Sequence, residues 1–156
     1  MIGCRVRKGR IVSDARASRE DQIAGIAGQF LDFIDVQTGS APPHPEAVKA
    51  DGLLDAIAAL DSSLDQLADF GDIYSADRMQ SIEPLVLPAA ALIGEYFLAA
   101  SGAAWLEPGY DADTTLVIAI PGGVAVDLTG AVRASLMTGQ SNLRLMAARL
   151  LDPESS

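Results

Sequence analysis

One stretch constrains this sequence more than any other: residues 84–104 are 21 residues long and carry a single charge, Glu95. A helix that spans a bilayer needs about 20 consecutive apolar residues, so length alone would allow a membrane span. The charge near the middle, Pro88, two glycines and the lack of flanking Lys or Arg anchors all argue against one. We therefore expect a buried core helix and no membrane partner.

Glu95 is the most informative residue of that stretch. A buried carboxylate must find a partner or take up a proton, because unpaired burial costs several kcal/mol. We expect a structural ion pair with Arg133 that joins the helix to the C-terminal helices and lowers the pKa of Glu95. Arg144, Arg78 and backbone amides are the alternative partners. A carboxylate that faces a cavity with a raised pKa would instead indicate ligand binding or catalysis.

Two amphipathic helices are expected before this stretch. A capping box at residues 18–21 starts the first, apolar residues from 23 to 34 share one face, and Gly39 ends it. Gly25 and Gly28 within it indicate close helix packing. Residues 40–45 are rich in proline, which predicts an extended connector.

The second helix shows apolar residues at 4-3-4-3 spacing, the pattern of a helix packed on another helix. Residues 70–72 are expected to end it, Ser75 to start a short turn, and Pro84 to occupy the first turn of the apolar helix. The spaced residues are Leu53, Ile57, Leu60, Leu64 and Leu67.

Beyond Gly102 the apolar period changes to two, which predicts strands. A β-branched run at 114–120, a tight turn at 121–123 and a return at 124–128 predict a hairpin, with a third strand around Trp105. Thr129 is expected to cap a short helix that ends at Gly139, and Ser141 or Asn142 to start the last helix.

The fold class predicted is α+β, in which a helical layer packs on a small antiparallel sheet of two or three strands at about residues 104–128. Helices lie at both ends of the order. The 156 residues are expected to form a single domain, with residues 1–17 as a basic arm or hairpin.

Charge is unevenly distributed along the chain. Six of the eleven basic residues lie in the first nineteen positions; from Glu20 onward five bases face twenty acids, a balance of −15. A body this acidic repels nucleic acid and anionic membranes, so neither is expected as a partner. We expect a basic protein partner on an acidic ladder, or else a solvated acidic face. The ladder consists of Asp61, Asp65, Asp69 and Asp72.

Motifs for catalysis, nucleotide binding and metal binding are absent from the sequence. One cysteine and one histidine, His44, cannot build a structural metal site, so no metal or cofactor is expected. His44 lies among prolines, where we expect an exposed and inert side chain. The N-terminal residues lack an apolar signal region, and with the single cysteine this predicts a cytoplasmic protein.

Residues 85–130 carry a family resemblance. The string Gly94-Glu95-Tyr96 near a helix end, Trp105 on a strand and the hairpin at 121–123 are similar to a group of uncharacterised small bacterial domains. Those domains show a helix ending in Gly-Glu-aromatic, a Trp-bearing strand and a short hairpin. The resemblance implies this local arrangement and no activity.

Two function classes follow from the sequence. The first is a non-enzymatic interaction or regulatory protein, such as an immunity-type factor, that uses an acidic surface. The second is a small-molecule-binding protein or hydrolytic enzyme that uses Glu95 with Asp127 or Tyr96. A convergent pocket around Glu95 would favour the second class, and a flat acidic face the first. The sequence leaves the oligomeric state open.

Overall fold

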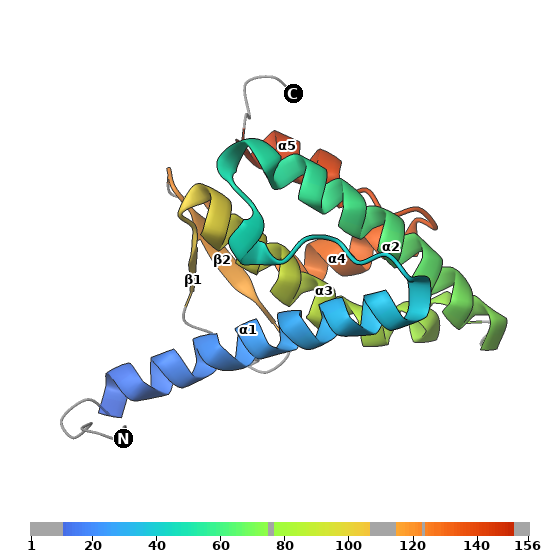
Figure 1. Cartoon of the computed structure of the whole chain (residues 1–156), viewed down its shortest axis with the longest axis horizontal. Coiled ribbons are helices and arrows are strands. Elements are labelled where there is room, and N and C mark those ends of the chain that lie inside the picture. Colours follow the sequence, from blue (N-terminus) through green and yellow to red (C-terminus); the bar gives the residue numbers. More distant parts are fainter. Residues whose placement is uncertain (1–10, 75–76, 107–114, 123, 152–156) are drawn as a thin grey trace.

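The computed structural model describes residues 11–74, 77–106, 115–122 and 124–151, with side chains in the first helix from Glu20 onward. Figure 1 shows a helical body with a small sheet at one side. This confirms the predicted α+β class with helices at both ends of the order. The helices are α1 (Ile11–Thr38), α2 (Leu53–Tyr74), α3 (Arg78–Ser101), α4 (Leu128–Met137) and α5 (Leu143–Leu151), and the strands are β1 (Ala104–Trp105), β2 (Val117–Ile120) and β3 (Val124–Asp127).

Helix α3 is the centre of the molecule, and α1, α2 and α4 all pack against it. Its middle is fully buried, with Leu92, Ile93 and Phe97 at 0% exposure. Among the described residues, α3 alone is long and apolar enough to cross a membrane, and 61% of its most apolar window is buried inside the fold. Membrane spans and core helices share this composition. The predicted burial of the helix is confirmed.

Helix α3 begins earlier than the sequence suggests. Asp77 is its N-cap, with a side chain that accepts a 3.0 Å hydrogen bond from the Met79 amide. The helix then continues through Pro84 and Pro88, so the expected start at Pro84 is wrong; the predicted cap Ser75 lies outside the described residues. The two prolines are four residues apart and therefore share one face, which lies along α1.

Helix α1 also begins earlier than the expected capping box, at Ile11. No glycine or proline occurs from residue 11 to residue 24, so no helix-breaking residue prevents the helix from extending from residue 18 toward the N-terminus. The predicted arm or hairpin over residues 1–17 is therefore wrong for 11–17, and residues 1–10 lie outside the described part. Gly39 follows the helix with a φ of +77°, which confirms the predicted end.

Helix α2 confirms its predicted apolar seam, since all five spaced residues are buried. It does not end at Gly71 but runs to Tyr74. A β-carbon at Gly71 would lie 3.1 Å from the Ser81 carbonyl oxygen, so the glycine permits a close approach of α2 and α3. Between α1 and α2, the connector contains only two short 3-10 turns, Pro45–Ala47 and Ala50–Gly52.

The three strands form an antiparallel sheet in the order β1-β2-β3. Trp105 pairs with Ile118, and Ile118 pairs with Val126 on the other side. Ile118 and Ile120 alternate with half-buried neighbours, so one face of β2 packs on the helical core. The predicted hairpin and third strand are confirmed over these described residues.

Both C-terminal helices have different caps from those expected. Asp127, and not Thr129, caps α4: its side chain accepts hydrogen bonds from the Gly130 amide at 3.0 Å and the Thr129 hydroxyl at 2.7 Å. Helix α5 begins at Leu143, and its cap is Asp61, from α2. A cap that comes from 82 residues away in sequence leaves no local signal.

Candidate functional site

The side chain of Glu95 is held by the strand next to its helix. The indole Nε1 of Trp105 donates a 2.9 Å hydrogen bond to Glu95 Oε2. The preceding residue, Gly94, makes room for the same ring, since a β-carbon there would lie 2.0 Å from Trp105 Cη2. Gly94, Glu95 and Trp105 therefore form one contact between α3 and β1, and they are the residues on which the resemblance rests.

The expected ion pair between Glu95 and Arg133 is wrong. Arg133 instead makes a two-point contact with Glu83, at 3.2 Å from Nε to Oε1 and 3.0 Å from Nη2 to Oε2. This pair lies at the surface, where both side chains are more than a third exposed. Glu83 and Glu95 are on the same helix, and the arginine of α4 reaches only the one nearer the N-terminus.

A hollow of about 370 Å³ lies beside Glu95. We call it the Glu95 hollow. Its walls come from α1 (Ala24, Ala27, Gly28), the connector (His44, Pro45, Glu46) and α3 (Glu95, Leu98, Ala99).

Gly28 helps to keep the hollow open, because a β-carbon at this position would meet no atom of the described residues within 4 Å. The same holds for Gly25, so the predicted role of this glycine pair in close helix packing is wrong. A glycine inside a helix lowers its stability by roughly 0.5–1 kcal/mol relative to alanine. At position 28 the helix therefore carries this cost beside the open space of the hollow.

The connector wall is fixed by Tyr96, the residue after Glu95. Tyr96 is fully buried and its hydroxyl donates a 2.7 Å hydrogen bond to the Pro43 carbonyl oxygen. Burial raises the pKa of the Tyr96 phenol, so the hydroxyl stays protonated and can serve as this donor. Because His44 follows Pro43 directly, the contact also places the single histidine of the chain at the hollow.

Glu95 is half-buried, and burial is the main cause that raises its pKa. The hydrogen bond from Trp105 acts in the opposite direction, and the charge of Glu20 on α1 raises the pKa further. The expected lowering of this pKa is therefore wrong. The protein keeps a carboxylate at the wall of a hollow, in an environment that disfavours its charge.

No family model, curated protein or solved structure matches this chain. The resemblance of residues 85–130 to small bacterial domains therefore stays a prediction. The contact of Gly94 with Trp105 gives its short motifs a physical meaning, whatever the family.

The two residues named as catalytic companions of Glu95 are engaged elsewhere. Asp127 caps α4, and the hydroxyl of Tyr96 is used on the connector. The structure instead brings His44 and Glu46 to the hollow. His44 is exposed, as the sequence predicted. The sequence did not indicate that His44 and Glu46 lie beside Glu95, because both are far from it along the chain and belong to a stretch without periodicity. The run of prolines was their only signal, as it indicated a defined path for the chain.

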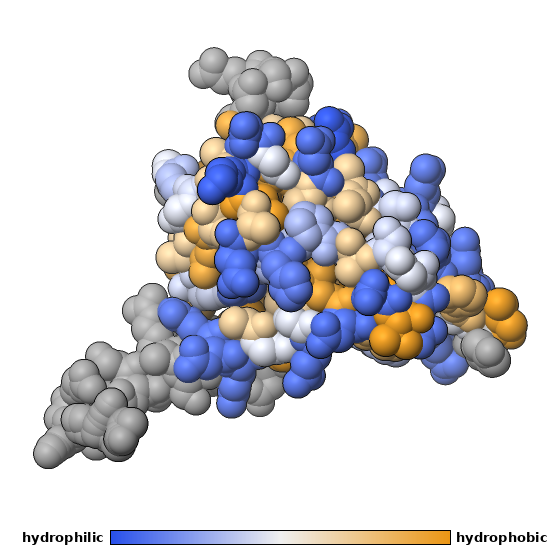
Figure 2. All heavy atoms as spheres, viewed as in Figure 1, coloured by the Kyte–Doolittle hydropathy of each residue, from blue (hydrophilic) through white to orange (hydrophobic). Residues whose placement is uncertain are grey.

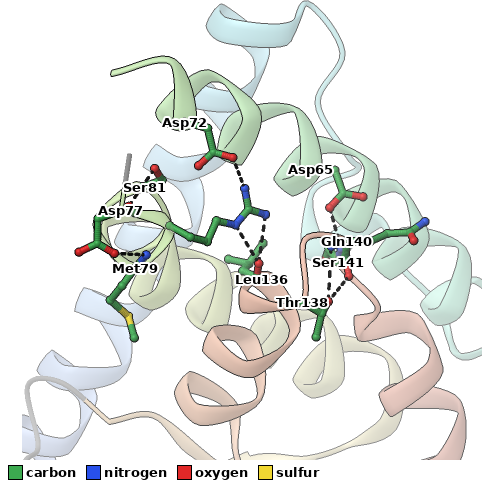
Figure 3. Close-up of polar contacts among 10 residues, drawn as sticks. Asp65, Asp72, Asp77, Met79, Ser81, Leu136, Thr138, Gln140 and Ser141 are labelled. Atoms are coloured by element: carbon green, nitrogen blue, oxygen red, sulfur yellow. Dashed lines mark hydrogen bonds and ion pairs between the residues drawn. The ribbon is translucent and has the colours of Figure 1, made fainter. Parts of the chain in front are cut away.

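The acidic ladder serves the fold at three of its four positions. Asp61 is buried and accepts hydrogen bonds from the Ser141 hydroxyl at 2.5 Å and from the Leu143 and Arg144 amides at 2.9 Å. Asp65 accepts a 2.6 Å hydrogen bond from the Ser141 amide, and its pKa is raised mainly by burial (Figure 3). These carboxylates compensate the N-terminus of α5.

The last member of the ladder, Asp72, forms an ion pair with Arg78, at 2.5 Å between Oδ2 and Nη1. The same guanidinium donates to the Leu136 carbonyl oxygen, near the end of α4, at 3.2 Å from Nε and 3.1 Å from Nη2 (Figure 3). Arg78 thus joins α2, α3 and α4. Of the ladder, only Asp69 is both exposed and without a described contact of this kind. The ladder therefore does not present four free carboxylates to a partner.

The Glu95 hollow combines apolar wall residues with two carboxylates, of Glu95 and Glu46, and the imidazole of His44. Within the described residues, no three His, Cys, Asp or Glu side chains lie together in the manner of a metal site. An arrangement of this kind suits an organic ligand with a positive or hydrogen-bond-donating head and a short apolar body.

Proposed function

We propose that this protein binds a small organic cation, an amine or guanidinium compound, in the Glu95 hollow. The observation that carries the proposal is the half-buried carboxylate of Glu95 on the wall of the hollow, oriented by Trp105. A ligand cation placed against Glu95 would relieve the cost of burying its charge, because opposite charges attract more strongly where water is excluded.

The surroundings support a cation over an anion. Glu46 lines the hollow together with Glu95, and the nearby Glu20 adds negative charge, as its effect on the pKa of Glu95 indicates. The apolar walls from Ala24, Ala27 and Leu98 suit a short aliphatic body. An anionic ligand would meet this negative charge without a described lysine or arginine among the lining residues.

The alternative of an acidic surface for a basic protein partner has less support. Asp61, Asp65 and Asp72 make contacts within the chain, so the ladder is not the free acidic face that this proposal requires. The criterion set by the sequence, a pocket around Glu95 against a flat acidic face, therefore favours the small-molecule class. We propose binding without chemistry, since Asp127 and Tyr96 are not placed to act on a ligand there.

Trp105 provides the measurement, because it is the only tryptophan and it contacts Glu95 directly. The full chain is titrated with n-butylamine, n-butylguanidine and choline, and with n-butanol and butyrate as neutral and anionic matches. We expect a saturable change of Trp105 fluorescence with at least one cation, confirmed by calorimetry. No response to any cation, or an equal response to butanol or butyrate, contradicts the proposal.

Three variants locate the binding. Glu95→Gln keeps an oxygen for the Trp105 hydrogen bond but removes the charge, and should weaken the cation at least about tenfold. Gly28→Leu should fill the hollow and also abolish binding, without touching Glu95. Glu83→Gln is the matched control, since it removes a carboxylate from the same helix outside the hollow, and it should bind as the wild type does.

A further inference from the structure

The N-terminal half of α1 projects beyond the rest of the molecule (Figure 1). Helix α1 has 28 residues and is therefore about 42 Å long at 1.5 Å per residue. Its described buried side chains lie between Ile23 and Ile34. Because most helical stability in proteins comes from a packed face, the projecting end of a helix is stabilised when another surface covers it.

An apolar surface lies on the other half of the same helix. We call it the α1 flank: Ile26, Gln29, Phe33 and Val36, spaced three, four and three residues apart on one side of the helix. Phe33 is 45% exposed although its ring stacks on Phe30, and Val36 is 78% exposed. Hydrophobic atoms reach the surface over this end of the molecule, where α1 and α2 finish (Figure 2).

The α1 flank borders a groove of about 370 Å³ between α1 and α3, whose far wall is formed by Pro84, Leu85 and Pro88. This groove is on the opposite side of α1 from the Glu95 hollow, since Ala24 and Gly28 face the hollow and Ile26 and Phe33 face the groove. A helix could lie in this groove and leave the Glu95 hollow open.

Charge complementarity identifies the occupant. The projecting turns, residues 11–19, carry Arg16 and Arg19 against the single Asp14, and four further basic residues precede them in the sequence. The α1 flank is bordered by the exposed carboxylates of Asp32 and Asp35. The N-terminal end of α1 is therefore basic, and the C-terminal half of the same helix carries an acidic and apolar surface.

We propose that the groove receives α1 of a second copy of this chain, in an antiparallel two-fold dimer. In such an arrangement the basic turns of each copy lie on the α1 flank and the acidic residues of the other, so every contact occurs twice. The two helices run antiparallel, which also pairs the positive N-terminal end of each helix dipole with the acidic half of its partner.

The test is the mass of the full chain in solution, by light scattering and sedimentation equilibrium over a range of protein and salt concentrations. We expect about 32.4 kDa at low salt, twice the 16.2 kDa of the chain, with dissociation as salt screens the charges. A protein that stays monomeric at every concentration overturns the proposal. So does a monomer that sediments with vesicles of anionic lipid, because the basic turns would then serve a membrane surface.

Charge reversal distinguishes this pairing from other contacts. Arg16→Glu with Arg19→Glu, and separately Asp32→Arg with Asp35→Arg, should each weaken the dimer at least tenfold at low salt. The four substitutions together should restore it, because opposite charges face each other again. A folded fourfold variant that remains monomeric, while the wild type dimerises, contradicts the antiparallel pairing.

Phe33→Glu tests the apolar part of the same surface and should give a folded monomer. Leu145→Glu is its matched control, since Leu145 is similarly exposed, at 42%, on α5, a helix that packs against α2 and α4. If both variants dissociate the dimer, or neither does, the α1 flank is not the interface. Glu95→Gln should leave the mass unchanged, so this result is independent of cation binding.

Discussion

The ring of Trp105 occupies the space that a side chain at Gly94 would need, with Cη2 only 2.0 Å and Cζ2 2.3 Å from the position of a β-carbon. Gly94 lies on the fully buried side of α3, and Trp105 is 5% exposed on β1. This close approach is what lets the indole reach the neighbouring Glu95. The sheet is thus attached to the central helix at a point where one methyl group cannot be accommodated.

Gly94→Ala should therefore destabilise the protein strongly. The added methyl group must displace the indole ring or the helix, and overpacking of this kind costs about 1–3 kcal/mol or more. Alanine favours a helix over glycine, so any loss comes from the steric conflict. The free energy of unfolding in urea measures the effect.

Gly25→Ala is the matched control for that substitution. Gly25 is also inside a helix, but among the described residues a β-carbon there meets nothing within 4 Å. We expect a gain of about 0.5–1 kcal/mol from helix propensity alone. Equal effects of the two substitutions would contradict the proposed contact with Trp105.

Glu95→Gln should leave the protein as stable as the wild type at neutral pH, or more stable. The pKa of Glu95 is raised in the folded state, mainly by burial, so its charged form opposes folding. That penalty is absent at a pH below the pKa that Glu95 has in the unfolded chain. It grows as pH rises from there to the pKa of Glu95 in the folded protein, and it is complete above that pKa. Glutamine removes the penalty and can still accept the Trp105 hydrogen bond.

Melting temperatures of this variant and the wild type between acidic and neutral pH provide the check. The difference should appear as pH rises and disappear toward acid, where the wild-type carboxyl is protonated. Among the described residues, the charged or titratable groups around Glu95 are Glu20 on α1, and His44 and Glu46 on the connector. A loss of more than about 1 kcal/mol at neutral pH would show that a charged hydrogen bond to Trp105 outweighs the burial cost.

Glu83→Gln should have the opposite effect and lower the stability of the protein at neutral pH. Its hydrogen bond with Arg133 lowers the pKa of Glu83, so the pair contributes stability that is present above the unfolded pKa and is lost as pH falls through the folded one. The pair is exposed to solvent, so the loss at neutral pH should stay below about 1 kcal/mol. Added salt should reduce it further, as thermal melts at two ionic strengths can measure.

Asp61→Ala should cost about 2–3 kcal/mol, because it leaves two amides of α5 and the Ser141 hydroxyl without their acceptor. Asp69→Ala belongs to the same ladder but removes an exposed side chain, so it should change stability by less than about 0.5 kcal/mol. Urea unfolding of both variants tests this. Similar costs at both positions would mean that the capping of α5 by α2 contributes little.

Leu92→Ala should cost about 2–5 kcal/mol, as expected for a large-to-small change at a fully buried site. Leu145→Ala, at a site that is 42% exposed, should cost much less. A loss below about 1 kcal/mol at Leu92 would mean that the centre of α3 is loosely packed.

The sequence by itself determined the elements whose signal is local. The apolar run around Leu92 predicted a buried helix, the spacing of leucines in α2 predicted its packed face, and Gly39 and Gly102 marked two helix ends. These predictions succeeded because periodicity and glycine act within a few residues of where they are read. The starts of α1 and α3 were predicted too late. A capping pattern and a proline suited to a first turn permit a helix start but do not stop a helix that already continues through them, as α1 does at residue 18 and α3 at Pro84.

Only the tertiary structure decided the partners of the polar residues. The charge of Glu95 was evident in the sequence, but whether Arg133 or Trp105 would reach it depended on how α4 and β1 meet α3. Asp61 caps a helix 82 residues away, and His44 reaches the hollow because Tyr96 holds the connector. Hydrogen bonds are short and directional, so they form only after packing has brought remote elements together, and periodicity along the chain carries no record of that meeting.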